Sequence, residues 1–176
     1  MAKHVAFLRA INTGNRRVKN PQLTEVLIQC GATSAVGFLA SGNVIFEIDR
    51  DVDRSFVSTV EGAFNEALRF NVPAIMRTEA QVREILANDA LGAASEKGQK
   101  VFVALTRDKL TAETRAAVLK LQTGDDDLAV CDTEVYWLPR SGQYNSELDV
   151  SALEKLTGVM TIRTLRTLER IRDKFL

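Results

Sequence analysis

The stretch Ala35-Val-Gly-Phe-Leu-Ala-Ser-Gly-Asn-Val-Ile-Phe-Glu-Ile48 decides the fold of this chain. Its two apolar runs, 35–40 and 44–48, predict two strands, and Ser41-Gly42-Asn43 between them predicts a tight hairpin turn. Strands joined by so short a turn run antiparallel, because a parallel pair needs a long crossover connection. The sheet that holds this hairpin is therefore at least partly antiparallel.

The same kinds of element lie on both sides of the hairpin. Apolar residues at helical spacing predict helices over 21–30 and 52–68, and short apolar runs predict strands over 5–8 and 72–76. The sequence Thr78-Glu-Ala-Gln81 resembles a capping box and predicts a further helix after the last strand. The first half therefore follows the order strand, helix, strand, strand, helix, strand, with a trailing helix.

The second half of the chain repeats this order. Its predicted elements are the strand 101–105, a helix from Thr111, the strands 128–131 and 134–138, the helix 148–156, the strand 159–162 and a closing helix over 165–175. The matching ends Ile75-Met-Arg-Thr78 and Thr161-Ile-Arg-Thr164 support a duplication. We therefore predict an α+β protein of two tandem ferredoxin-like βαββαβ units, each an antiparallel sheet with helices on one face.

The boundary between the two halves is predicted from composition. Residues 92–98 are small and polar, as in a linker. We predict an N-terminal lobe over 1–92, a linker over 93–99, and a C-terminal lobe over 100–176 that includes the closing helix.

The overall composition favours a globular cytoplasmic protein. Lys plus Arg and Asp plus Glu number 23 each, so no global charge draws the chain to nucleic acid or to a membrane. No apolar run approaches the roughly 18 residues of a membrane span, and Met1-Ala-Lys-His-Val enters a strand without the features of a signal peptide. Cys30 and Cys131 are too few for a disulfide framework, so we expect reduced thiols.

The segment Arg9-Ala-Ile-Asn-Thr-Gly-Asn-Arg-Arg-Val-Lys-Asn20, here called the basic loop, is the strongest candidate for a site. It is longer than a connector needs to be, and it carries four basic residues and no acid. Asn12, Gly14 and Asn15 suit turns and a close backbone approach. In the predicted topology, the basic loop, the turn 41–43 and Phe70-Asn71 all leave the same end of the sheet. We expect them to cluster there.

Such a cluster suits a phosphate or carboxylate group. Arginine provides bidentate donors and lysine a point charge, and the start of the predicted helix near Asn20 adds N–H groups and the positive end of its dipole. We predict that Arg9 and Lys19 take the negative charge, whereas Asn12, Ser41 and Asn43 orient the ligand. The full candidate set is Arg9, Asn12, Asn15, Arg17, Lys19, Ser41 and Asn43. The alternative is that the basic residues only aid solubility and that Ser41-Gly42-Asn43 is only a turn.

The sequence gives no support for histidine-dependent catalysis or for a zinc or calcium site. His4 is the only histidine, and its place at the start of a strand favours a structural role over a catalytic one. One histidine and two distant cysteines make no zinc signature, so we expect no metal and no cofactor. Asp49-x-Asp51-x-Asp53 lacks the glycine and glutamate of a calcium loop, and we expect Asp49 or Asp51 to cap the following helix.

Two further segments have more than one interpretation. The acidic run Asp125-Asp126-Asp127 is interpreted as solvated surface. Tyr136-Trp137 lies on a predicted strand, where exposed rings would stack on bases, as RNA-recognition modules do, or lie at a homodimer interface. Phe102 and Trp137 equally fit a core or an interface.

Three segments resemble the signature of a bacterial family. They are Arg9-Ala-Ile-Asn-Thr-Gly14, Arg17-Val-Lys19 and Leu39-Ala-Ser-Gly-Asn-Val-Ile-Phe46. The family is known only as domain of unknown function 1697, and its pattern is roughly R-G-I-N-V-G, then V-K, then Q-S-G-N-V-V-F. The resemblance in length and order of elements covers nearly the whole chain. It implies the tandem ferredoxin-like fold and supplies no activity.

The resemblance is looser in the C-terminal half. The family pattern there has Ser-Lys-Leu before a helix and Thr-x-Arg-Asn-Trp-x-Thr near the end. Ser146, Thr161, Arg163 and Thr167 match it, whereas the family's Lys, Asn and Trp are replaced. The resemblance therefore does not carry a binding role to this region.

The leading hypothesis is binding of a small phosphate- or carboxylate-bearing ligand at the basic loop and the neighbouring turn. One alternative is a nucleic-acid-binding module that uses the basic loop with Arg166, Arg170 and Arg172, and whose binding would weaken steeply with salt. Another is a homodimeric interaction protein without catalysis. Whether the protein is an enzyme stays open, because no catalytic group is identifiable.

Overall fold

The computed structural model describes residues 2–14, 16–91 and 99–176. Within these residues the chain forms two four-stranded antiparallel sheets and six α-helices, which confirms the α+β class. It divides into two compact units: unit 1 comprises Met1–Arg83 with Ile171–Leu176, and unit 2 comprises Glu84–Arg170. The predicted linker lies, except for Gln99, outside the described residues.

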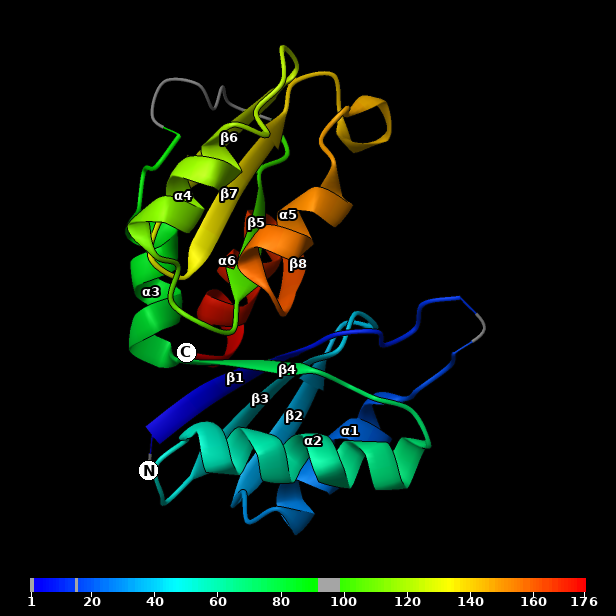
Figure 1. The fold of residues 1–176 in the computed structure, drawn as a ribbon. Coiled ribbons are helices and arrows are strands. Elements are labelled where there is room, and N and C mark those ends of the chain that lie inside the picture. The colour runs from blue at the N-terminus through cyan, green and yellow to red at the C-terminus, as the bar shows by residue number, and fades with distance from the viewer. Residues whose placement is uncertain (1, 15, 92–98) are drawn as a thin grey trace. The chain divides into compact units, whose positions relative to one another are not determined.

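Unit 1 has the predicted order of elements (Figure 1). They are β1 (Ala2–Leu8), α1 (Asn20–Gln29), β2 (Ser34–Phe38), β3 (Asn43–Ile48), α2 (Arg54–Leu68), β4 (Ala74–Thr78) and the first part of α3 (Glu79–Ala87). The strand order across the sheet is β2-β3-β1-β4, and every neighbouring pair is antiparallel. The predicted hairpin is therefore confirmed. Its first strand ends at Phe38 rather than at residue 40, because Leu39 has a left-handed backbone with φ 60°.

Unit 2 repeats this arrangement. Its elements are β5 (Phe102–Thr106), α4 (Ala112–Leu119), β6 (Asp126–Val130), β7 (Glu134–Pro139), the 3₁₀ turn η2 (Gln143–Asn145), α5 (Val150–Thr157), β8 (Met160–Thr164) and the first part of α6 (Leu165–Phe175). The strand order is β6-β7-β5-β8, again antiparallel throughout.

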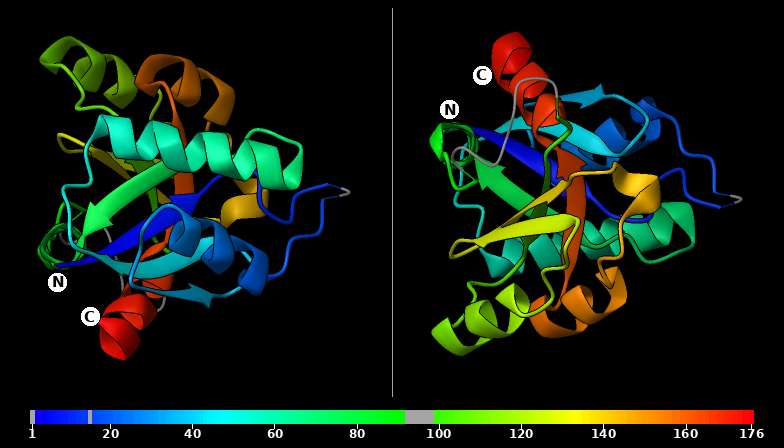
Figure 2. Two further views of the ribbon diagram at one scale, coloured as in Figure 1. Left: turned by 90° about the horizontal axis from the view of Figure 1, so that it is seen from below. Right: turned by 90° about the horizontal axis from the view of Figure 1, so that it is seen from above.

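Each unit buries one face of its sheet under two helices. In unit 1, α1 and α2 lie side by side over the sheet, as do α4 and α5 in unit 2 (Figure 2). Alternate residues of β3, such as Val44 and Phe46, point into the first of these cores and meet Phe56 and Phe64 of α2. The strands therefore fix which loops gather at each end of each sheet.

The two units share details as well as order. Val5 pairs with Arg77 in the first sheet and Val103 pairs with Arg163 in the second. In both, an Arg-Thr pair then leads directly into a helix. The backbone N–H of Gln81 donates to Thr78 Oγ1 at 3.1 Å, and that of Thr167 donates to Thr164 Oγ1 at 3.2 Å. The Thr78 capping box is confirmed, because Thr78 N also donates to Gln81 Oε1 at 2.9 Å.

Two expectations about aspartates were wrong. Asp53, not Asp49 or Asp51, caps α2, since its carboxylate accepts from Phe56 N at 2.8 Å. The acidic run 125–127 is not solvated surface, because Asp126 is fully buried. Its neighbours are engaged too: Asp125 accepts from Ser141, and Asp127 pairs with Arg140 at 2.6 Å.

Asp126 organises the region around the end of β7. Its Oδ1 accepts from Trp137 Nε1 at 2.7 Å and from Ser146 Oγ at 2.6 Å, and its Oδ2 accepts from Thr123 Oγ1 at 2.7 Å and from Glu147 N at 3.1 Å. Burial acts to raise the pKa of Asp126, but these hydrogen bonds outweigh it and hold the pKa below the ordinary 3.8. The ionised carboxylate is therefore the form that the fold stabilises.

Replacing Asp126 with Asn is expected to destabilise unit 2 by about 2–4 kcal/mol at neutral pH, because four donors, among them the buried Trp137 N–H, lose a charged acceptor that is itself buried. Because the folded-state pKa lies below 3.8, the wild-type contribution is present above that value and is lost as the pH falls through the folded pKa. The difference between D126N and wild type should therefore shrink as the pH falls below 3.8.

Urea unfolding followed by the fluorescence of Trp137, the only tryptophan, measures this difference. Asp89, an exposed residue of the same unit, provides the matched control D89N, which should change stability by less than about 0.5 kcal/mol. A constant gap between D126N and wild type from pH 7 to pH 2 would contradict the assignment.

Candidate functional site

The basic loop and the two neighbouring connections converge at one end of the unit 1 sheet, here called the site end. Leu8 N donates to Gly42 O at 2.7 Å, which joins the end of β1 to the hairpin turn. Arg9 N donates to Pro73 O at 2.9 Å, which joins the same point to the segment before β4. The prediction that these segments cluster is confirmed.

Asn12 holds the basic loop in shape. Its Nδ2 donates to Val18 O at 3.0 Å and to Ala40 O at 2.7 Å, and its Oδ1 accepts from Val18 N at 2.7 Å. One amide thus closes the loop upon itself and fastens it to the hairpin turn. Further along the loop, the Arg16 guanidinium lies 4.4 Å from the centre of the Phe70 ring, a cation–π contact.

Unusual backbone conformation concentrates at this end. Of the described residues other than glycine, four have positive φ: Ala10 (63°), Asn12 (54°), Leu39 (60°) and Arg69 (62°). All four lie in or next to the three converging connections. Left-handed backbone is uncommon for such residues, costs free energy, and tends to occur where function requires a particular loop shape.

Gly42 is required where the turn meets the loop. Its φ is +76°, and a Cβ there would lie 2.8 Å from both Cβ and Cγ1 of Ile11. No side chain fits this approach without displacing Ile11, which is itself buried. Because residue 42 is a glycine, the backbone of the turn can lie directly against the Ile11 side chain of the loop.

Two of the predicted ligand residues have structural roles instead. Asn43 is fully buried, and its Nδ2 donates to Phe38 O and to Ser41 Oγ, both at 3.0 Å. Asn12 has both ends of its amide engaged by backbone, as described above. Neither amide orients a ligand in this arrangement. Asn15, also predicted, lies outside the described residues.

The remaining predicted residues surround the site end with positive charge. Arg17, Lys19 and Ser41 are exposed, and Arg9 is half-buried. Arg17 also supports the loop, because its NH1 donates to Gly14 O at 3.0 Å and to Arg16 O at 2.9 Å.

The start of α1 offers fewer N–H groups than expected. Lys19 N donates to Gln22 Oε1, and Gln22 N donates to Lys19 O, each at 3.0 Å. Pro21 has no N–H to offer. The side chains of the loop, more than the helix terminus, therefore carry the positive potential.

Unit 2 has an equivalent end with a different charge balance. There Thr106 N donates to Thr133 O and Arg107 N donates to Val159 O, each at 2.9 Å, in the positions that Leu8 and Arg9 occupy in unit 1. In this unit, however, Asp132 pairs with Lys109 at 2.5 Å and with Arg115 at 2.9 Å. The hydrogen bond and charge of Lys109, with the charge of Arg115, lower the pKa of the Asp132 carboxyl. An acid from the hairpin turn thus pairs with Lys109 and Arg115 at this end of unit 2.

The histidine and the aromatic pair considered for other chemistry have structural roles. His4 is 5% exposed and stacks on Phe46 with ring centres 5.4 Å apart, and burial lowers its pKa despite the hydrogen bond to Ala2 O. This confirms its structural role. Tyr136 and Trp137 are buried, so neither ring is available for base stacking or an interface. Across the described residues no group of three or more His, Cys, Asp or Glu side chains is placed to hold a metal ion.

The C-terminal residues that match the family pattern are also structural. Ser146 donates to Asp126, and Arg163 NH1 donates to Thr161 Oγ1 at 2.7 Å and to Ile162 O at 2.9 Å. Thr167 takes part in the cap at the start of α6. Burial lowers the pKa of Arg163 to about 10.

Replacing Gly42 with Ala is expected to destabilise unit 1 by about 2–4 kcal/mol, because positive φ and the overlap with Ile11 act together. Gly14→Ala is the matched control. Gly14 also has positive φ (57°), but nothing lies within 4 Å of its added Cβ. It should cost only about 1–2 kcal/mol. Urea unfolding followed by circular dichroism compares the two; equal losses would mean that the Ile11 contact is unimportant.

Comparisons with known proteins address the fold and the family. In the described part of the chain, no helix is long and apolar enough to cross a membrane. No curated protein matches the chain. A solved structure, that of the conserved bacterial protein SP0830 from Streptococcus pneumoniae, is similar with a TM-score of 0.74 over 98% of this chain and 97% of that one, at 21% sequence identity. This likeness concerns the fold alone.

The sequence comparison identifies the family. Residues 1–136 match the family described as Protein of unknown function (DUF1697), a span that contains the whole of the basic loop, the hairpin, β5 and β6, and the beginning of β7. The resemblance seen in the N-terminal motifs is thereby confirmed, and the chain belongs to the DUF1697 family.

Proposed function

We propose that unit 1 binds the anionic group of a small phosphate- or carboxylate-bearing ligand at its site end. The observation that carries this proposal is the coincidence of two features there. The basic loop has four basic residues and no acid, and the left-handed non-glycine residues of the described chain gather around it. Uncommon backbone conformation beside a cluster of basic side chains is typical of a preorganised anion site.

Arg9, Arg17 and Lys19 supply the charge in this proposal, and the Ser41 hydroxyl supplies a neutral donor. Asn12 and Asn43 act indirectly, since they fix the loop and the turn that present these groups. A rigid presentation favours binding because little side-chain and loop entropy remains to be lost.

The comparison with unit 2 supports the proposal. In that unit the Asp132 carboxylate accepts from Lys109 and Arg115 at an equivalent end of the sheet. Unit 2 thus balances its basic residues from within the chain. The basic loop of unit 1 contains no acid in its sequence, and we infer that its basic side chains contact the anionic group of a ligand.

We also propose that each unit is a ferredoxin-like βαββαβ domain and that the two arose by tandem duplication. The element order, the strand orders β2-β3-β1-β4 and β6-β7-β5-β8, and the shared Arg-Thr caps support this. So does the correspondence of Arg9 with Arg107, which follow β1 and β5 with the same backbone hydrogen bond.

Nucleic-acid binding is the weaker candidate. Of the arginines that would extend the basic surface, Arg166 lies 3.5 Å from Glu169 and Arg172 lies 2.8 Å from Asp173. These pairs reduce the positive charge that a phosphate backbone would meet. A nucleic-acid site would also show steep salt dependence, because each phosphate contact releases a counterion.

Replacing Arg9 and Lys19 together with Ala is expected to abolish binding of small anions while the fold remains intact. Pyrophosphate and citrate serve as the phosphate and carboxylate probes in a thermal-shift assay. A probe present at a hundredfold excess over its dissociation constant adds about 2.7 kcal/mol to stability, so wild type should melt at a higher temperature with it than without it. The R9A/K19A variant should show no such shift.

The control removes the same charge from elsewhere. Lys120→Ala and Lys155→Ala together delete two exposed lysines of unit 2 and should leave the shift unchanged. If neither probe shifts wild type, or if both double variants lose the shift equally, the proposed site is wrong.

A further inference from the structure

A small pocket lies on the face of the unit 1 sheet opposite to α1 and α2. Its volume is about 280 Å³, and it is lined by Lys3, Ser34, Val36, Ile45, Phe46, Glu47, Lys174 and Phe175. All of these residues belong to unit 1, because the last six residues of the chain are part of that unit. The pocket is separate from the site end, and no residue of the basic loop lines it.

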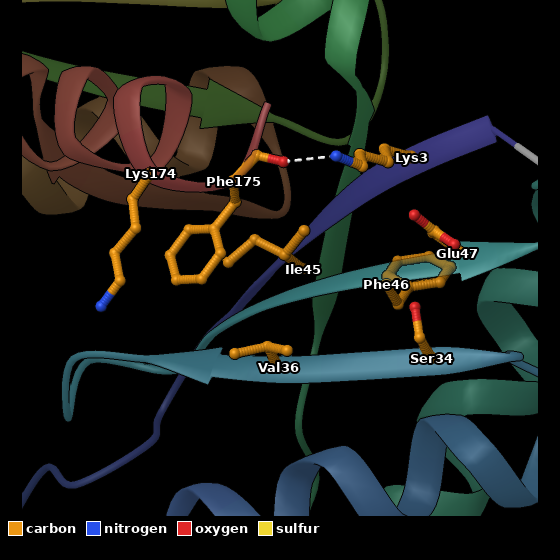
Figure 3. A pocket seen from close by; sticks show the side chains of 8 residues that line it. All are labelled: Lys3, Ser34, Val36, Ile45, Phe46, Glu47, Lys174 and Phe175. Carbon is orange, nitrogen blue, oxygen red and sulfur yellow. Dashed lines mark hydrogen bonds between the residues drawn. The ribbon is translucent and has the colours of Figure 1, made fainter.

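The floor of the pocket has a polar row and an apolar row. Ser34 and Lys3 are the cross-strand neighbours of Glu47, one on each side of it, so three polar side chains lie in line across β2, β3 and β1. Two residues further along β2 and β3, Val36 pairs with Ile45 on the same face of the sheet. Figure 3 shows the two rows side by side, with Ser34 and Glu47 at one end of the pocket and Val36 and Ile45 at the other.

The C-terminal end of α6 forms the wall. The Phe175 ring lies beside Ile45 and above Val36 (Figure 3), and it meets the Phe38 ring edge-on, with ring centres 5.3 Å apart. The Lys174 ammonium lies 5.3 Å from the centre of the Phe175 ring, on the other side of this aromatic from the polar row. Val36 is 48% exposed, which is high for an apolar residue beside a pocket. This part of the pocket suits an apolar group.

The charges of the polar row are arranged unusually. A lysine and a glutamate opposite each other on neighbouring strands ordinarily form an ion pair. Here Lys3 Nζ donates instead to Phe175 O at 2.8 Å (Figure 3), and within the described part of the chain it forms no ion pair with Glu47. The Glu47 carboxylate and the Ser34 hydroxyl have no hydrogen-bond partner of their own among the described residues. The Lys3 ammonium keeps two of its three donors.

We propose that this pocket binds a small zwitterion with an apolar side chain, of the α-amino acid class. The ammonium group of the ligand meets the Glu47 carboxylate, and its carboxylate meets the remaining donors of Lys3 and the Ser34 hydroxyl. Its side chain lies over Val36 and Ile45, against Phe175. The volume agrees, because pockets for drug-sized molecules begin at roughly 300 Å³ and this one is slightly smaller.

The test uses L-leucine and two analogues that each lack one charge. Isoamylamine is leucine without its carboxylate, and 4-methylpentanoate is leucine without its ammonium group. Titration of the ¹⁵N-labelled full-length protein, followed by NMR, gives the affinity and locates the ligand. Leucine should bind saturably and move the amide signals of 34–36 and 45–47. Each analogue should bind at least about tenfold more weakly, because a charged hydrogen-bond partner is lost.

Variants separate this pocket from other binding. Glu47→Gln should weaken leucine binding about tenfold or more, whereas Glu66→Gln, an exposed glutamate on α2, should leave it unchanged. Val36→Trp fills the apolar end without changing any charge and should abolish binding. The R9A/K19A variant should bind leucine as wild type does, so this inference stands or falls independently of the anion site.

Several results would overturn the proposal. They are an absence of saturable leucine binding to wild type, unchanged affinity in E47Q or V36W, and equal affinity for leucine and isoamylamine. The last result would make the pocket a site for amines only.

Discussion

The close approach of the basic loop to the hairpin turn is the contact on which the whole site end depends. Gly42 has no side chain where it meets Ile11, and Leu8 donates to the same turn. The Asn12 amide then links the turn to the loop, because it donates to Ala40 O beside the turn and accepts from Val18 N at the far end of the loop. Because Ile11 and Val18 are buried, the loop is anchored at two apolar points, while Arg16, Arg17 and Lys19 are exposed. The basic side chains are therefore carried by a loop whose backbone is fixed by buried residues and hydrogen bonds.

The two units show how one framework supports different chemistry. Equivalent strand ends carry Arg9 in unit 1 and Arg107 in unit 2, each fixed by the same backbone hydrogen bond. What differs is the hairpin turn, which holds Ser41 in the first unit and Asp132 in the second. In unit 2 the Asp132 carboxylate pairs with Lys109 and Arg115, whereas the corresponding turn position of unit 1 holds an uncharged serine, so one fold carries two different sets of side chains.

Much of this architecture could be predicted from the sequence, because strand and helix periods are local and the hairpin fixes the sheet direction. The convergence of the loops followed from topology alone. The roles of Asn12, Asn43 and Asp126 could not be predicted, because each depends on partners that only the tertiary structure brings near. An aspartate within an acidic run is usually at the surface, yet Trp137 and Ser146 supply hydrogen-bond donors that make the burial of Asp126 favourable.

The pocket on the other face of the unit 1 sheet could not be predicted for the same reason. The three polar residues Lys3, Ser34 and Glu47 come from three different strands, so only the folded sheet brings them together. The sequence does show that Ser34 and Glu47 each have an apolar neighbour.

Unit 1 is discontinuous in the chain, and this affects the order in which the protein is completed during synthesis. Residues up to Arg83 leave the ribosome before unit 2 does, but Ile171–Leu176 belong to the same unit and follow unit 2. Until they arrive, Phe38 lacks its edge-on aromatic partner and Lys3 lacks the carbonyl of Phe175. Unit 2 is a single uninterrupted segment and has no such dependence. Unit 1 is therefore completed only after unit 2 has been synthesised, and a nonsense mutation shortly before codon 171 would damage unit 1 although it leaves residues 1–83 intact.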